Sequence, residues 1–226
     1  MELLHQSLTN IFELNSSFSE VVSLSLYVSI SATLISAIFS IITASYMATN
    51  NFTGKNLLIL IVNSLMSLTP VVVGLILYII FSSSGFLGFM DLLYSSTIMM
   101  VAQFIIITPI IISLSFRVLS EKYELLNEYL QSLNTSKNKA RNTIIYESRY
   151  NLLIIIITGL SRALSEVGAV IVVGGNIDNL TRVMTTSIVL ETSRGELALA
   201  LSLGLSLIII AIILNLIIYL LKNKFL

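Results

Sequence analysis

Five long apolar stretches dominate this 226-residue sequence and constrain what it can fold into. They lie at about 20–47, 57–81, 94–117, 151–175 and 197–221. A helix rises about 1.5 Å per residue, so each stretch is long enough to cross about 30 Å of hydrocarbon. Charged residues make up only 11% of the chain, whereas a soluble domain has about 25%. The sequence therefore predicts an all-α membrane protein with five transmembrane helices.

The positive charges predict how these helices are oriented. Nine Lys and Arg residues follow the first, third and fifth stretches, whereas only Arg182 and Arg194 fall on the opposite side. Cytoplasmic loops hold the excess of Lys and Arg in membrane proteins. We therefore expect the C-terminus to be cytoplasmic and the N-terminus to lie outside. Residues 1–19 are expected to form an outer or interfacial segment, with Leu4, Leu8 and Ile11 on its apolar side.

The largest expected cytoplasmic element spans residues 118–150. Apolar residues recur there at spacings of three and four, which is typical of an amphipathic helix: Leu119, Tyr123, Leu126 and Leu130. The run Asn134-Thr135-Ser136 is expected to end this helix, and Ser136 to precede a second one. This pair of helices is either a solvated connection or a docking element for a cytoplasmic partner.

On the outer side, Gly174-Gly175-Asn176 is expected to close the fourth helix, because these residues adopt the left-handed conformation of helix C-termini. The polar stretch that follows, 177–196, is interrupted by apolar residues. It predicts a short helix or a re-entrant piece packed against the bundle.

Residue counting argues against catalysis by this chain. A zinc site of the metalloprotease type needs two His residues, but the sequence has only His5 and no Cys. Asp91 and Asp178 fall in loops, and Gly54-Lys55 lacks the remainder of a phosphate-binding loop. Zero net charge also argues against a nucleic-acid partner. We expect no enzyme activity, no metal and no bound cofactor, so any nucleotide energy must come from another subunit.

Arg162 and Glu166 are charges within the fourth apolar stretch. An ionised group at the bilayer centre costs about 2.5–3.5 kcal/mol, so such residues usually pair or face a polar cavity. Their spacing of four places them on one helix face, within reach of each other. They are either a self-neutralising packing pair or groups that line a translocation path, with Arg162 meeting an anion or Glu166 moving a proton.

Two prolines, Pro70 and Pro109, lie within apolar stretches and predict kinks, since proline lacks the N–H that an unbroken helix requires. Small residues also recur every four positions in the first stretch, at Ser36, Ser40 and Ala44. Such rows let helix backbones approach closely in lipid, so they predict a packing surface.

Several segments resemble the type I permease subunits of ABC importers. Residues 162–169 read RALSEVGA, 174–177 read GGNI and 181–186 read TRVMTT. These segments are similar to those of the tungstate and molybdate branch, and they resemble tungstate permeases more closely than molybdate permeases. In the cytoplasmic region, Glu128, Asn134 and Ile144 fall at the Glu, Gly and Ile positions of the loop that marks the family.

The resemblance implies a MetI-like fold, with an ABC transmembrane type-1 domain over residues 20–222. It implies a homodimer in a prokaryotic plasma membrane, two cytoplasmic ATPases that bind ATP and Mg²⁺, and an extracytoplasmic binding protein. Coupling to the ATPase would then fall to Glu128, Leu130, Leu133 and Asn134. The candidates for the translocation path or the dimer interface are Arg162, Glu166, Asn176, Arg182, Thr185 and Thr186.

The expected function is therefore uptake of an oxyanion, most closely tungstate, by alternating access. Import of molybdate or sulfate is the alternative within the same class. A proton-coupled secondary transporter that uses Glu166, or a membrane scaffold that transports nothing, are alternatives of other classes.

Overall fold

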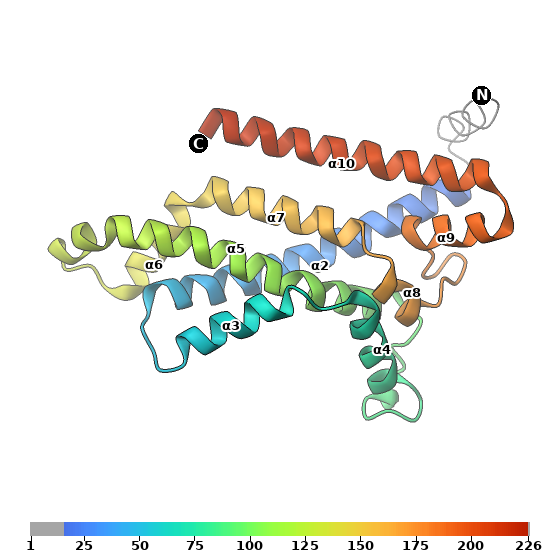
Figure 1. The fold of residues 1–226 in the computed structure, drawn as a ribbon, viewed down its shortest axis with the longest axis horizontal. Helices are drawn as coiled ribbons and strands as arrows, with labels where there is room; N and C mark the ends of the chain where they lie inside the picture. The colour runs from blue at the N-terminus through green and yellow to red at the C-terminus, as the bar shows by residue number, and fades with distance from the viewer. Residues whose placement is uncertain (1–15, 226) are drawn as a thin grey trace.

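A computed structural model describes residues 16–225, and over these residues the regular elements are all helical, as predicted. Leu4, Leu8 and Ile11 lie outside the described residues. The elements in chain order are α2 (Ser16–Thr49), α3 (Lys55–Leu65), α4 (Pro70–Phe81), the 3-10 turn η1 (Gly88–Met90), α5 (Ser96–Ser132), α6 (Lys137–Glu147), α7 (Arg149–Leu164), α8 (Gly168–Gly174), α9 (Met184–Arg194) and α10 (Leu197–Phe225). Figure 1 shows that α2, α5, α7 and α10 run lengthwise through the molecule.

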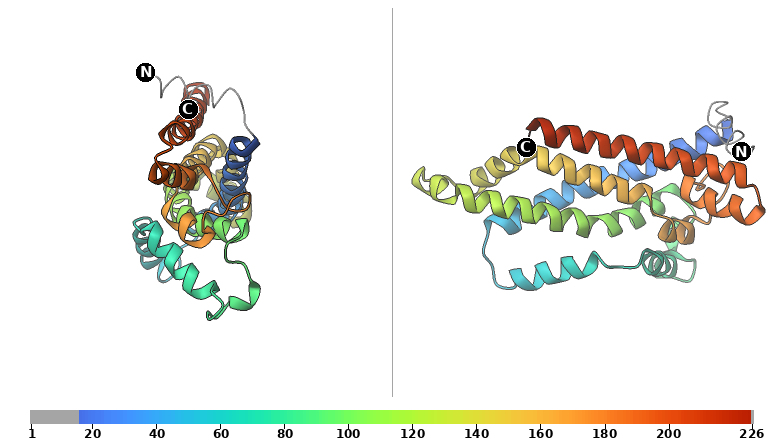
Figure 2. Two further views of the ribbon diagram at one scale, coloured as in Figure 1. Left: turned by 90° about the vertical axis from the view of Figure 1, so that its right-hand side faces the viewer. Right: turned by 45° about the horizontal axis from the view of Figure 1, so that its top comes forward.

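Three helices in the described part of the chain, α2, α5 and α10, are long and apolar enough to span a membrane. The number rises to five if each of two bent helix pairs counts as one span. These pairs are α3 with α4, bent by 99°, and α6 with α7, bent by 68°. The helices α3 and α4 lie on one side of the bundle, and α10 lies on the other (Figures 1 and 2).

The prediction of one kinked helix over 57–81 is wrong. The helix ends at Leu65 and a new one begins at Pro70, the first residue of α4. Thr69 is extended, with φ −72° and ψ 121°, because a following proline disfavours the helical conformation. Pro70 therefore starts a helix in a new direction, in the position where its missing N–H costs nothing.

The prediction of one continuous helix over 151–175 is also wrong. The helix α7 ends at Leu164, and α8 begins at Gly168 after a break of three residues. The predicted C-terminal signal is confirmed, since Gly175 has φ 69° and Asn176 has φ 53°, both left-handed.

The third apolar stretch extends further than predicted. The helix α5 continues through Pro109 and through the expected cytoplasmic helix to Ser132. The predicted break is confirmed, since Asn134 is left-handed with φ 50° and α6 starts three residues later. The kink at Pro109 stays a prediction.

The predicted small-residue surface of α2 packs against α5. Ser36, Ser40 and Ala44 are fully buried. The Ser36 hydroxyl lies 2.9 Å from Thr108 Oγ1, and Ser40 donates to the Thr108 carbonyl at 3.3 Å. The row is therefore confirmed as a packing surface.

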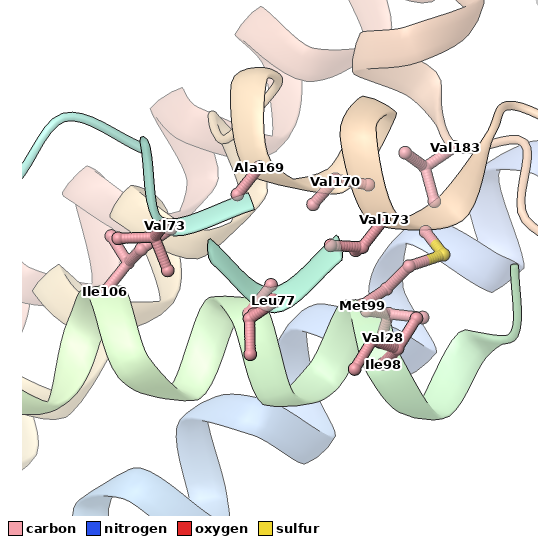
Figure 3. Packing of buried hydrophobic residues seen from close by; sticks show 11 residues of the cluster. Val28, Val73, Leu77, Ile98, Met99, Ile106, Ala169, Val170, Val173 and Val183 are labelled. Carbon is pink, nitrogen blue, oxygen red and sulfur yellow. The ribbon is translucent and has the colours of Figure 1, made fainter. Parts of the chain in front are cut away.

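A second core forms where α4 and α8 pack together over α5 (Figure 3). It contains Val73 and Leu77 from α4, Val170 and Val173 from α8, and Met99 from α5. These buried side chains fix α8 beside α4, so the positions of the two helix breaks depend on each other.

Candidate functional site

The helices that follow the two breaks at 66–69 and 165–167, α4 and α8, meet at their first turns. A Cβ atom at Gly168 would lie 2.6 Å from Val71 Cγ2, and one at Gly74 would lie 2.9 Å from the Ala169 Cα. Only glycine permits this approach of α4 to α8. Discontinuous helices that meet in this way commonly form substrate sites in transporters.

A polar stripe lies beside this crossing, on the outside of α7. Thr158, Arg162 and Ser165 are exposed and follow one another at spacings of four and three. The Arg162 side chain is 45% exposed. Lipid contact with this face would be costly. The stripe is therefore expected to face water or another polar surface.

The expected contact between Arg162 and Glu166 is confirmed. Arg162 Nη2 lies 3.7 Å from Glu166 Oε2, and the Glu166 side chain is only 4% exposed. The other carboxylate oxygen accepts a hydrogen bond from the Ala169 N–H at 3.5 Å. The pair does not lie on one continuous helix: Arg162 is in the last turn of α7 and Glu166 is in the break.

Side chains from three other helices hold the break. Gln103 Nε2, on α5, donates to the Ala163 carbonyl at 3.1 Å and to Ser29 Oγ of α2 at 3.3 Å. Thr185 Oγ1, from α9, donates to the Glu166 carbonyl at 2.9 Å. Gln103 is not among the predicted site residues, although a carboxamide in the middle of an apolar stretch could have identified it.

The predicted path residues Thr185 and Thr186 are buried. Thr186 accepts a hydrogen bond from the Val183 N–H at 3.1 Å, so its hydroxyl caps the start of α9. In this conformation the hydroxyls of both threonines hold the local structure, and their place on the path stays a prediction.

Arg182 and Asn176 lie in the loops around α8 and α9. Arg182 Nη1 forms an ion pair of 2.8 Å with Asp178 Oδ1. Together with Glu20 and Tyr27 of α2, Arg182 lines a cavity of about 450 Å³. Asn176 turns the chain after α8 with its left-handed backbone. The predicted path residues therefore divide between the α7/α8 break and this separate cavity.

The far end of α5 carries an exposed apolar stripe. Leu125, Tyr129 and Leu133 are 73%, 66% and 62% exposed and follow at spacings of four. Glu128 lies exposed beside them, whereas Leu130 is buried, so a direct partner contact predicted for Leu130 is not supported. We call Leu125, Tyr129 and Leu133 the α5 end stripe. Leu125 and Tyr129 are not among the predicted residues.

Comparison with known proteins identifies the family, although no family model matches the sequence. The chain is 37% identical over 204 residues to the tungstate uptake system permease protein TupB of Peptoclostridium acidaminophilum, covering 90% of each chain. It is 37% identical over 172 residues to TupB of Campylobacter jejuni, covering 75% of this chain and 71% of that one. A probable anion ABC transporter permease protein of Haloferax volcanii is 29% identical over 182 residues, which cover 78% of each chain. The chain therefore belongs to the permease subunits of ABC importers, in the branch that contains the tungstate uptake permeases.

Proposed function

We propose that this chain is the permease of an ATP-driven tungstate importer that works as a homodimer by alternating access. Its family membership makes it a membrane-embedded oxyanion permease of a prokaryote, without catalytic activity of its own. The names of two relatives, both tungstate uptake permeases, support tungstate as the substrate. Tungstate and molybdate are nearly identical tetrahedral dianions, so molybdate is the main competitor.

The observation that carries the proposal is the half-exposed side chain of Arg162 on the polar stripe of α7. A guanidinium offers several N–H donors to the oxygens of an anion. Glu166, buried behind it, balances the charge when no anion is present. Two copies of the chain, related by a two-fold axis, would enclose this face and keep it away from lipid.

The α5 end stripe supports docking of a cytoplasmic ATPase. Its three large apolar side chains are exposed, which a surface in contact only with water does not explain. Glu128 and Asn134 lie beside them. The partner ATPases would bind ATP and Mg²⁺ and hydrolyse the nucleotide. Their movement against the stripe would rock the two subunits between outward-open and inward-open states.

The membrane arrangement follows from the charge distribution. In the proposed topology the chain crosses the membrane five times, α6 lies on the cytoplasmic side, the N-terminus is outside and the C-terminus is cytoplasmic. The outer side then carries seven acidic and two basic residues. Such a surface repels a dianion, so an extracytoplasmic binding protein is needed to deliver it.

Uptake into vesicles tests the proposal. The permease is reconstituted with its ATPase and binding protein, and radiolabelled tungstate, molybdate and sulfate are supplied in turn. We expect tungstate uptake to require ATP on the side of the membrane where the ATPase is bound. It should not require a proton gradient. Uptake driven by a proton gradient without the ATPase would contradict the proposal and favour a secondary transporter that uses Glu166.

Two arginine variants test the route. Arg162→Gln is expected to lower tungstate uptake roughly 10- to 100-fold, the usual effect of losing a hydrogen bond to a charged group. Arg194→Gln is the matched control, because Arg194 also pairs with a buried glutamate, Glu191, at 3.3 Å. Equal losses in the two variants would remove the support for a path along α7.

A further inference from the structure

A buried carboxamide ties three helices together at the α7/α8 break. Gln103 is 4% exposed. Its amide nitrogen bonds to the Ala163 carbonyl of α7 and to Ser29 Oγ of α2, at 3.1 and 3.3 Å. Within residues 16–225, its Oε1 atom is buried and has no hydrogen-bond partner.

The carbonyl that Gln103 binds belongs to the last turn of α7, where backbone acceptors lose their helical partners. Ala163 O also accepts a hydrogen bond from the Glu166 N–H at 3.2 Å. Gln103 therefore supplies the second bond to this oxygen. Inside a membrane no bulk water can replace that bond.

The tie acts on residues of the proposed path. Ala163 directly follows Arg162, and its carbonyl forms part of the turn that ends at Glu166. Holding this carbonyl fixes the orientation of the last turn of α7, and with it the direction in which Arg162 extends. The bond from Thr185 to the Glu166 carbonyl holds the other side of the same turn.

An apolar side chain of the same length would fill this space without burying an unpartnered oxygen, which is unfavourable. Packing alone therefore does not account for a carboxamide here, whereas its N–H donor does. We propose that Gln103 is a positioning residue that fixes the end of α7, so that ATP hydrolysis by the partner is converted into anion movement past Arg162. This inference rests on the proposed function.

The experiment compares three variants in the complete transporter reconstituted in vesicles. Gln103→Met keeps the side-chain length but removes the donor. Gln103→Glu removes the donor only while the carboxyl is ionised. Ser36→Ala is the matched control, because it removes a buried polar contact between the same helices, α2 and α5, that does not touch α7. The readouts are tungstate transported per ATP hydrolysed and the thermal stability of each variant.

We expect Gln103→Met to transport about tenfold less tungstate per ATP than the unmodified chain, in line with the loss of the buried hydrogen bond to the Ala163 carbonyl. A protonated carboxyl can donate to the Ala163 carbonyl, whereas a carboxylate cannot. The Gln103→Glu variant should therefore recover transport per ATP as the pH falls. Arg162 and Glu166, the charged groups at this break, are present in every variant. Any effect of their titration on transport therefore also appears in the pH profile of Gln103→Met, which serves as the reference for Gln103→Glu.

The outcomes separate a positioning role from a merely structural one. Ser36→Ala should lower the thermal stability and leave transport per ATP unchanged. A Gln103→Met variant that loses stability but keeps its transport per ATP would overturn the inference, as would a Gln103→Glu variant with the pH profile of Gln103→Met. If the unmodified transporter shows no ATP-driven uptake, the proposed function fails, and the inference fails with it.

Discussion

The close approach of α4 to α8 leads to a quantitative prediction for Gly74→Ala. The added Cβ would lie 2.9 Å from the Ala169 Cα and 3.0 Å from its carbonyl oxygen, both backbone atoms that no side-chain rotation can move. Carbon atoms in contact prefer about 3.5–4.0 Å, so the helices must separate by roughly 0.5 Å or more. Overpacking of this kind costs about 1–3 kcal/mol.

Alanine also favours a helix over glycine by about 1 kcal/mol, which offsets part of this cost. Gly204→Ala isolates that gain, because a Cβ at Gly204 of α10 has no atom within 4 Å. The two alanine variants should therefore differ in the free energy of unfolding by about 1–3 kcal/mol, with Gly74→Ala the less stable. For a chain of this size, that difference corresponds to about 2–12 °C in melting temperature.

Thermal unfolding in detergent measures this difference, at one scan rate because membrane proteins often unfold irreversibly. Uptake should fall in Gly74→Ala as well, since the crossing positions both helix breaks. Equal melting temperatures for the two variants would refute the close packing of α4 on α8.

Three further predictions concern the ion pair, the α5 end stripe and the topology. Arg162→Leu leaves the buried carboxylate of Glu166 without its cationic partner and should destabilise the protein, though by less than the roughly 3–5 kcal/mol typical of fully buried pairs, since the Arg162 side chain is 45% exposed. Replacing both residues by leucine should restore part of the loss, and a double-mutant cycle of melting temperatures checks this. Tyr129→Glu should abolish co-purification of the ATPase while leaving the melting temperature unchanged, because Tyr129 is 66% exposed and contributes little to the fold. The sequence has no cysteine, so single cysteines at Ser84 and Lys222 can be labelled without background; an impermeant reagent on intact cells should label only the first.

The apolar stretches predicted the positions of the helices more accurately than the positions of the breaks within them. Hydropathy is averaged over a window of about 19 residues, so a break of three or four residues inside an apolar stretch barely changes it. Pro70 predicts a kink, although the structure has it at the first position of a new helix. An apolar stretch around a proline is compatible with both arrangements, so the local sequence does not distinguish them. The contact of Val71 with Gly168 accompanies the second arrangement, and that contact is not local.

The α7/α8 break was less accessible to prediction than the one at Pro70. Residues 165–167 include neither proline nor glycine. The carbonyls freed at this break bond to Gln103 and Thr185, which are 60 and 19 positions away from their partners. Arg162 and Glu166 could still be paired from their spacing, because their separation of four residues brings the side chains together even at the end of a helix.

The exposed residues at the end of α5 show a similar limit. The spacing of Leu119, Tyr123, Leu126 and Leu130 correctly predicted an inward face. The outward apolar residues Leu125 and Tyr129 follow the same helical period, and only the placement of neighbouring helices shows that they are left uncovered.

The length of α5 has a mechanical consequence. Its 37 residues form one helix, about 55 Å long at 1.5 Å per residue. The α5 end stripe lies at one end, and Gln103 lies in the third turn from the other. If the helix moves as a rigid rod, a tilt of about 5° about one end displaces the other by about 5 Å. Tyr129 and Gln103 are about 39 Å apart along this helix, so the same tilt applied at the stripe moves Gln103 by about 3.4 Å, a distance comparable to the length of the hydrogen bonds at the α7/α8 break.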